Sequence, residues 1–187
     1  MKNSKLNVHC LIAVVNFILL LLFIAPALHE FWHIVILFVY RCSYILQWKF
    51  LVGLSGKIEY LCSLSLQQER IVLLSGFIGN LLLGFFVLFL CFHFLSIKRY
   101  LISLFSLFTA FSFIFSSIAY FFNEEGDLVE LFRTFGFRDA FLLQIIGVVA
   151  LVLAFLVFKA SFQMVVENYF VSKLKTNFDE NRNNRKN

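Results

Sequence analysis

Two histidines and a glutamate near the start of the chain have the spacing of a metal-dependent hydrolase. The sequence around them reads Ala-Leu-His29-Glu30-Phe-Trp-His33-Ile, which fits the pattern H-E-x-x-H. On a helix, His29 and His33 lie one turn apart and face the same way, so their imidazoles can share one Zn²⁺. Glu30 stands beside them and can act as general base for a zinc-activated water. The pattern therefore predicts a catalytic zinc site.

A simpler interpretation is a helix with two buried, hydrogen-bonded histidines and a glutamate that pairs with one of them. The surroundings disfavour it, because the motif lies inside an apolar run from about Cys10 to Tyr40. Desolvating unpartnered polar groups there costs several kcal/mol. Ionisable groups at membrane depth indicate a functional site, and a His/His/carboxylate set with water suits Zn²⁺ best.

The composition is that of a helical membrane protein. The 187 residues are 61% hydrophobic and only 14% charged, and the mean hydropathy is +0.88. A soluble domain of this size would be far more polar. The net charge of +5 does not indicate nucleic acid, because the basic residues are scattered over loops and the tail, as positive-inside topology signals are.

Four apolar segments predict an all-α polytopic membrane protein with about four transmembrane helices. They run from about Cys10 to Tyr40, Ile71 to Leu95, Leu101 to Phe122 and Ala140 to Phe158. The first is longer than the roughly 20 residues that cross a bilayer, so it must tilt, kink or split. Pro26 predicts that the bend comes just before His29. This run is too long for a signal peptide, and we interpret it as an uncleaved span.

The segment between the first two spans predicts a small β-hairpin or an interfacial segment. Gln47 to Tyr60 partly alternates between apolar and polar residues and contains Gly53 and Gly56 as turn glycines. An ordinary loop, with Trp48 and Tyr60 at the membrane interface, is the alternative.

The four cysteines show no C-x-x-C pairing. They are Cys10, Cys42, Cys62 and Cys91, and three of them lie in or near apolar runs. We therefore expect small core residues rather than disulfides or metal ligands.

The second span carries small residues and one amide near its start. Gly76, Gly79 and Gly84 fall close to one helical face and allow near backbone contact. Helix packing explains these glycines but not Asn80, whose buried amide needs a partner that the catalytic centre could supply. His93, beside two basic residues at the far end, is interpreted as interfacial.

The acidic segment after the third span offers a third metal ligand, which a catalytic zinc requires. Asp127 follows Gly126 and either caps a short helix from Leu128 to Phe135 or folds back onto the two histidines. Rival donors are Glu124, Glu125, Glu130 and Asp139.

We expect one domain over residues 1–174 and a polar, disordered tail over residues 175–187. With four spans, the N-terminus, the turn at Lys98 and the tail share one side, and the segment from Asn123 to Asp139 lies opposite. Counting basic residues places both termini in the cytoplasm.

Three motifs together resemble the site-2 protease family of intramembrane zinc metalloproteases, especially its small bacterial members. They are the H-E-x-x-H motif, Ser75-Gly76-x-x-x-Asn80 and Gly126-Asp127, within about Pro26 to Gly136. Two departures are that Phe77 stands where the family usually has proline, and that the third motif lacks its proline.

The resemblance implies that His29, His33 and Asp127 bind zinc and that Glu30 is the catalytic base. Gly76 and Asn80 would lie beside the active site, with Asn80 as an oxyanion donor. Cleavage of a membrane protein or peptide in a bacterial inner membrane follows as the expected function, with a further membrane protein as regulator. The alternatives are an inactive relative that acts as a binding or scaffold protein and a zinc-binding transporter.

Overall fold

The computed structural model describes residues 4–50, 54–123, 126–137 and 140–184. Four helical segments in it are long and apolar enough to cross a membrane: Val8–Val39, Leu66–Ser96, Tyr100–Phe122 and Phe141–Lys173. A two-stranded antiparallel sheet lies between the first and second of these segments. The predicted all-α architecture with a hairpin between the first two spans is confirmed.

The first segment is divided as its length required. Helix α1 (Ser4–Leu19) runs into a π-helical turn, η1 (Leu20–Ile24), and then into α2 (Ala25–Val39). The backbone N–H of Ala25 bonds to the carbonyl of Leu20, five residues earlier. Pro26 follows directly, in the first turn of α2, where its missing N–H is tolerated. The irregular turn therefore lies just before Pro26 and the histidine motif, and a bend at Pro26 itself stays a prediction.

The hairpin consists of β1 (Tyr44–Phe50) and β2 (Leu54–Tyr60), with Tyr44 opposite Tyr60. Gly56 is not a turn residue as predicted, because it lies within β2 opposite Trp48. A Cβ at this position would collide with the Glu30 side chain, so glycine lets β2 lie directly on α2. Gly53 lies outside the described residues.

A disulfide between Cys42 and Cys62 closes the base of the hairpin, with the two Cα atoms 5.5 Å apart. The expectation that the cysteines are plain core residues is wrong for this pair, while Cys10 and Cys91 are free. The register explains the error. Each cysteine stands two residues outside the Tyr44–Tyr60 pair, so strand pairing carries the two cysteines towards each other.

The hairpin is also fixed to the second span by a polar contact. The Tyr60 hydroxyl donates a hydrogen bond to Glu69, at 2.9 Å. Partial burial and this carboxylate raise the pKa of Tyr60 to about 12. The hydroxyl therefore keeps its proton and its donor role at neutral pH.

Helices α3 (Leu66–Ser96) and α4 (Tyr100–Ala119) form the centre of the bundle. Ser65 starts α3 through a capping box with Gln68. In the third apolar segment, which contains α4, 67% of the most apolar window is buried inside the protein, against 11–28% for the other three. The main core forms where α1, α3, α4 and α6 meet around Leu107 and Phe111. The outer helices present large apolar side chains, as lipid contact requires.

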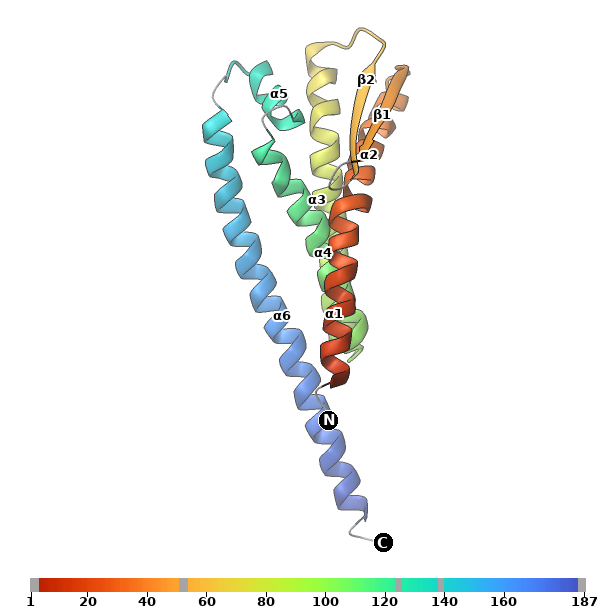
Figure 1. Ribbon diagram of the computed structural model, residues 1–187, viewed down its shortest axis with the longest axis vertical. Helices are drawn as coiled ribbons and strands as arrows, with labels where there is room; N and C mark the ends of the chain where they lie inside the picture. The colour runs from red at the N-terminus through yellow and green to blue at the C-terminus, as the bar shows by residue number, and fades with distance from the viewer. Residues whose placement is uncertain (1–3, 51–53, 124–125, 138–139, 185–187) are drawn as a thin grey trace.

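A turn of 3-10 helix, η2 (Tyr120–Phe122), ends the third segment, and α5 (Asp127–Thr134) and α6 (Ala140–Asn184) follow. Residues 175–184, for which the sequence predicts a disordered tail, continue α6 as helix. Figure 1 shows the hairpin and α5 at one end of the bundle and both termini towards the other. We call these the hairpin end and the terminal end.

Candidate metal centre

Two histidine nitrogens converge on one carboxylate at the hairpin end. His29 and His33 lie on α2 and are only 0% and 4% exposed. Their Nε2 atoms lie 2.7 Å and 3.0 Å from Oδ2 of Asp127. Ligand atoms of the three residues all lie within 4.8 Å of one another. These residues could therefore hold a metal ion.

Asp127 reaches the histidines because α5 begins with it. Gly126 occupies the position before the helix in an extended conformation, and no side chain caps the helix. Asp127 therefore does not cap α5, which was the alternative to a ligand role. Its carboxylate still lies at the positive end of the helix dipole, where negative charge is favourable.

Helix α5 is held against α3 at both of its ends. Leu128 and Leu131 pack with Leu73 of α3 in a small buried cluster. At the far end, Arg70 of α3 donates to the side chain and the carbonyl of Thr134, at 3.0 Å and 2.6 Å. Its guanidinium also lies 3.9 Å from the centre of the Phe135 ring. These contacts fix the helix that carries the third ligand.

The hydrogen bonding of His33 prepares Nε2 to be a metal ligand. Nδ1 lies 2.7 Å from the carbonyl oxygen of Val72, which only accepts, so Nδ1 is the donor. In a neutral ring, Nε2 then carries a lone pair that faces the Asp127 carboxylate. Two electron-rich atoms at 3.0 Å need a proton or a cation between them. A ring nitrogen held by a backbone carbonyl is typical of metal-bound histidine.

Asp127 carries the negative charge that a cation site needs. Burial acts to raise the pKa of its carboxyl, but its contacts with the imidazoles of His29 and His33 outweigh burial and hold the pKa below its ordinary value. The carboxylate is therefore ionised at neutral pH. One carboxylate and two imidazoles form a donor set that suits zinc.

The ring of His29 is fixed on two sides. On one side a Cβ at Gly76 would lie 2.6 Å from the imidazole, so only glycine allows α3 to approach this closely. On another side the ring of Tyr120 stacks on it, with 3.8 Å between ring centres and 6° between planes. Gly76 therefore lies directly beside His29, one of the candidate metal ligands.

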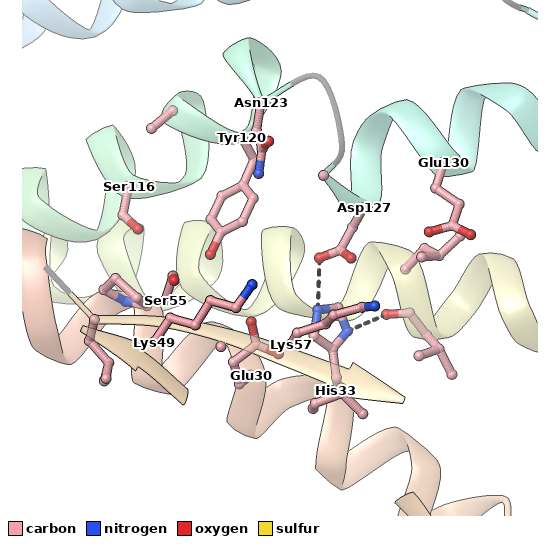
Figure 2. A pocket seen from close by; sticks show the side chains of 18 of the residues that line it. Glu30, His33, Lys49, Ser55, Lys57, Ser116, Tyr120, Asn123, Asp127 and Glu130 are labelled. Atoms are coloured by element: carbon pink, nitrogen blue, oxygen red, sulfur yellow. Dashed lines mark hydrogen bonds and ion pairs between the residues drawn. The ribbon is translucent and has the colours of Figure 1, made fainter. Parts of the chain in front are cut away.

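A cavity of about 700 Å³ opens next to these ligands. Glu30, His33 and Asp127 line it together with residues from β2 and from the end of α4. Figure 2 shows Glu30 inside the cavity, next to His33 and below Asp127. Glu30 is 6% exposed and is not one of the three ligands. Its carboxylate therefore lies in the cavity beside the group that could hold a metal ion.

Asn80 is not one of the residues that line this cavity. Its Nδ2 donates to the carbonyl of Ala25 at 2.8 Å, and the side chain is fully buried. Oδ1 has no hydrogen-bond partner in the described part of the chain. The amide thus fixes the start of α2, and contact with substrate stays a prediction.

Among the described residues, no other candidate ligand joins this group. Glu130 is exposed and lines the cavity, but it is not part of the set that could share an ion. Glu124, Glu125 and Asp139 lie outside the described residues. His93 is exposed near the end of α3, at the terminal end.

The sequence did not indicate two of the residues that line the cavity. Tyr120 resembles any aromatic at the end of a span, and its sequence context carries no signal of contact with His29. Lys49 lies on β1 and also lines the cavity. The alternation along the strand predicts on which side of the hairpin Lys49 lies. It does not predict which part of the protein that side covers.

Comparisons with known proteins gave no match: no family model, no curated protein and no solved structure is similar to the chain.

Proposed function

We propose that this protein is an intramembrane zinc protease that hydrolyses a peptide bond in or near a transmembrane segment. The observation that carries the proposal is the meeting of His29, His33 and Asp127 from two distant parts of the chain, with Glu30 beside them in one cavity. This combination supports the function that the site-2 protease resemblance implies.

The chemistry requires a base beside a Lewis acid. When bound, zinc would supply Lewis acidity towards a peptide carbonyl and a water molecule. Glu30 takes a proton from the attacking water and gives it to the leaving amine. Glu30 is only 6% exposed, and electrostatic effects are stronger around a carboxylate that has little contact with water.

The substrate we propose is a membrane protein whose helix unwinds at the cleavage point. A peptide bond within a helix is shielded and hydrogen-bonded, so it must become extended before attack. Strand β2 borders the cavity, and Ser55, Gly56 and Ile58 lie along it. This position suits an extended peptide lying alongside the strand.

We further propose that the hairpin end faces away from the cytoplasm of a bacterial inner membrane and that both termini are cytoplasmic. Two independent observations support this orientation. The basic turn at Lys98 and Arg99 lies at the terminal end. The Cys42–Cys62 disulfide lies at the hairpin end, and disulfides persist in oxidising compartments.

An inactive scaffold or a zinc transporter would use the same ligands differently. A transporter needs further ligands along a path through the bundle. Within the described residues, only the His29, His33 and Asp127 group is close enough to share an ion. The position of Glu30 beside that group favours an active enzyme over a scaffold.

The test is the zinc content of the protein purified in detergent, compared among wild type, His33→Ala and Asp127→Ala. We expect about one zinc per chain in the wild type and a loss in both variants, since three protein ligands hold a catalytic zinc. His93→Ala is the matched control, because His93 is exposed near the end of α3, at the terminal end. Wild-type protein that takes up no zinc after reconstitution would contradict the proposal.

Glu30→Gln separates metal binding from catalysis. The variant keeps the size of the side chain and removes the base, so zinc content should stay at the wild-type value. Cleavage of fluorescently labelled casein in detergent should fall roughly 100-fold or more. Equal cleavage by the variant and the wild type would exclude Glu30 as the base.

A further inference from the structure

Tyr120 is the aromatic residue of the cavity whose role the proposed reaction leaves open. It begins η2, directly after α4, and it is partly buried. Its ring lies flat on His29, which fixes the direction in which the hydroxyl projects. Figure 2 shows the hydroxyl pointing into the cavity from the side opposite Glu30 and Lys49.

The hydroxyl of Tyr120 makes no hydrogen bond within the described part of the chain. The other tyrosine of the cavity, Tyr60, instead donates to Glu69. A tyrosine hydroxyl in a partly buried place normally has a partner. A rigidly held hydroxyl with no acceptor among the described residues is suited to donate a hydrogen bond to an oxygen atom of the bound substrate.

Three other donors near the site are engaged or less well fixed. The amide of Asn80 donates to the Ala25 carbonyl. Lys49 is exposed on a strand, and the Lys57 ammonium pairs with Glu59 at 3.0 Å. Among these groups, Tyr120 alone combines contact with a ligand histidine and a hydroxyl directed into the cavity.

We propose that Tyr120 is a catalytic residue whose hydroxyl donates a hydrogen bond to the scissile carbonyl oxygen as negative charge develops on it. The hydroxyl keeps its proton throughout. Water supplies the new C–O bond, and Glu30 carries the proton to the leaving nitrogen. The inference rests on the proposed protease function, and it assigns the oxyanion role to Tyr120 rather than to Asn80.

The test compares two inhibitors on zinc-loaded protein in detergent by isothermal titration calorimetry. A phosphinic peptide mimics the tetrahedral oxyanion, and a mercaptoacetyl peptide binds zinc through sulfur without presenting that oxyanion. Tyr120→Phe keeps the stack on His29 and removes only the hydroxyl. We expect phosphinic-peptide affinity to fall about 10- to 100-fold, as for a lost hydrogen bond to a charged group, with unchanged zinc content and thiol affinity.

Tyr100→Phe is the matched control, because Tyr100 lies at the start of α4 against Tyr169. This variant should bind both inhibitors like the wild type. Equal loss of both inhibitors, or loss of zinc, in Tyr120→Phe would overturn the donor role in favour of positioning of His29. Unchanged phosphinic affinity would also overturn it. Zinc-loaded wild type that binds neither inhibitor would instead overturn the proposed protease itself.

Discussion

The position of the His29 imidazole depends on neighbouring residues that are not themselves candidate metal ligands. The imidazole lies between the backbone of Gly76 and the ring of Tyr120. Neither neighbour donates a ligand atom, yet together they decide where Nε2 lies relative to Asp127. The position of any metal held by this group therefore depends on packing that a motif of ligating residues does not describe.

Gly76→Ala should weaken zinc binding. The added methyl group would lie 2.6 Å from the ring, so His29 must shift from the position in which its Nε2 meets Asp127. Disturbing groups that orient metal ligands reduces affinity roughly 10- to 100-fold. Zinc affinity can be measured by competition with a fluorescent chelator, with lipid-facing Leu82→Ala on the same helix as control. Wild-type affinity in Gly76→Ala would show that His29 has room to shift.

Among the single elements, α5 matters because this helix of only eight residues carries Asp127, the third of the candidate ligands. The pairing of Arg70 with Thr134 fixes the end of α5 farthest from Asp127. Anchoring at both ends limits rotation of this short helix. Its orientation, rather than any property of the Asp127 side chain alone, places the carboxylate.

Arg70→Ala should therefore lower zinc affinity without removing a ligand. Loss of the contacts to Thr134 and Phe135 frees the end of α5, and the carboxylate then spends less time near the histidines. We expect a decrease of roughly ten-fold, at the low end for residues that support ligands. Arg133→Ala, which changes an exposed arginine on α5 itself, is the control. A similar decrease in both variants would point to net charge instead of the anchor.

The disulfide gives a second prediction for an element. Cys42→Ser should destabilise the hairpin, because the bond closes a loop between residues 20 positions apart. A loop of this length contributes roughly 3 kcal/mol to folding stability. Thermal unfolding followed by circular dichroism should show a lower midpoint for Cys42→Ser, and dithiothreitol should lower the wild-type midpoint equally. The Cys91→Ser control should respond to dithiothreitol as the wild type does.

The sequence predicted those elements and residues that local patterns determine. Hydropathy located all four spans, and H-E-x-x-H identified the paired histidines on α2. The disulfide was missed because it depends on strand register, although the symmetric placement of Cys42 and Cys62 about the turn could have revealed it. Tyr120 was missed because its contact with His29 arises only from the packing of α4 beside α2.

In the whole molecule, the candidate site and the chain termini lie at opposite ends of the helical bundle. The candidate site, the hairpin and the disulfide all lie at the hairpin end, and the chain termini lie towards the other end (Figure 1). In the proposed orientation, cleavage would take place near the oxidising surface of the membrane. Product released from that side would leave the cytoplasm-facing part of the substrate in the membrane.

The orientation can be checked in intact cells. Alkaline phosphatase, which is active only outside the cytoplasm, should be active when inserted after Phe137 and inactive when fused after Asn184. A membrane-impermeant maleimide should label an added cysteine near Phe137 but not one near Lys98. The reverse pattern would place the hairpin end in the cytoplasm and would leave the disulfide without an oxidising environment.

The π-helical turn before the histidine motif changes the direction in which the side chains of α2 point relative to those of α1. A π turn contains about one residue more than an α turn, and each residue of an α-helix advances by about 100°. The π turn therefore offsets the side of α2 that bears the histidines by about 100° from the direction that an uninterrupted α-helix of the same length would give it. Deleting Leu21 would remove the extra residue and restore a regular helix, so the two sides should keep their relative angle and both histidines should still face Asp127.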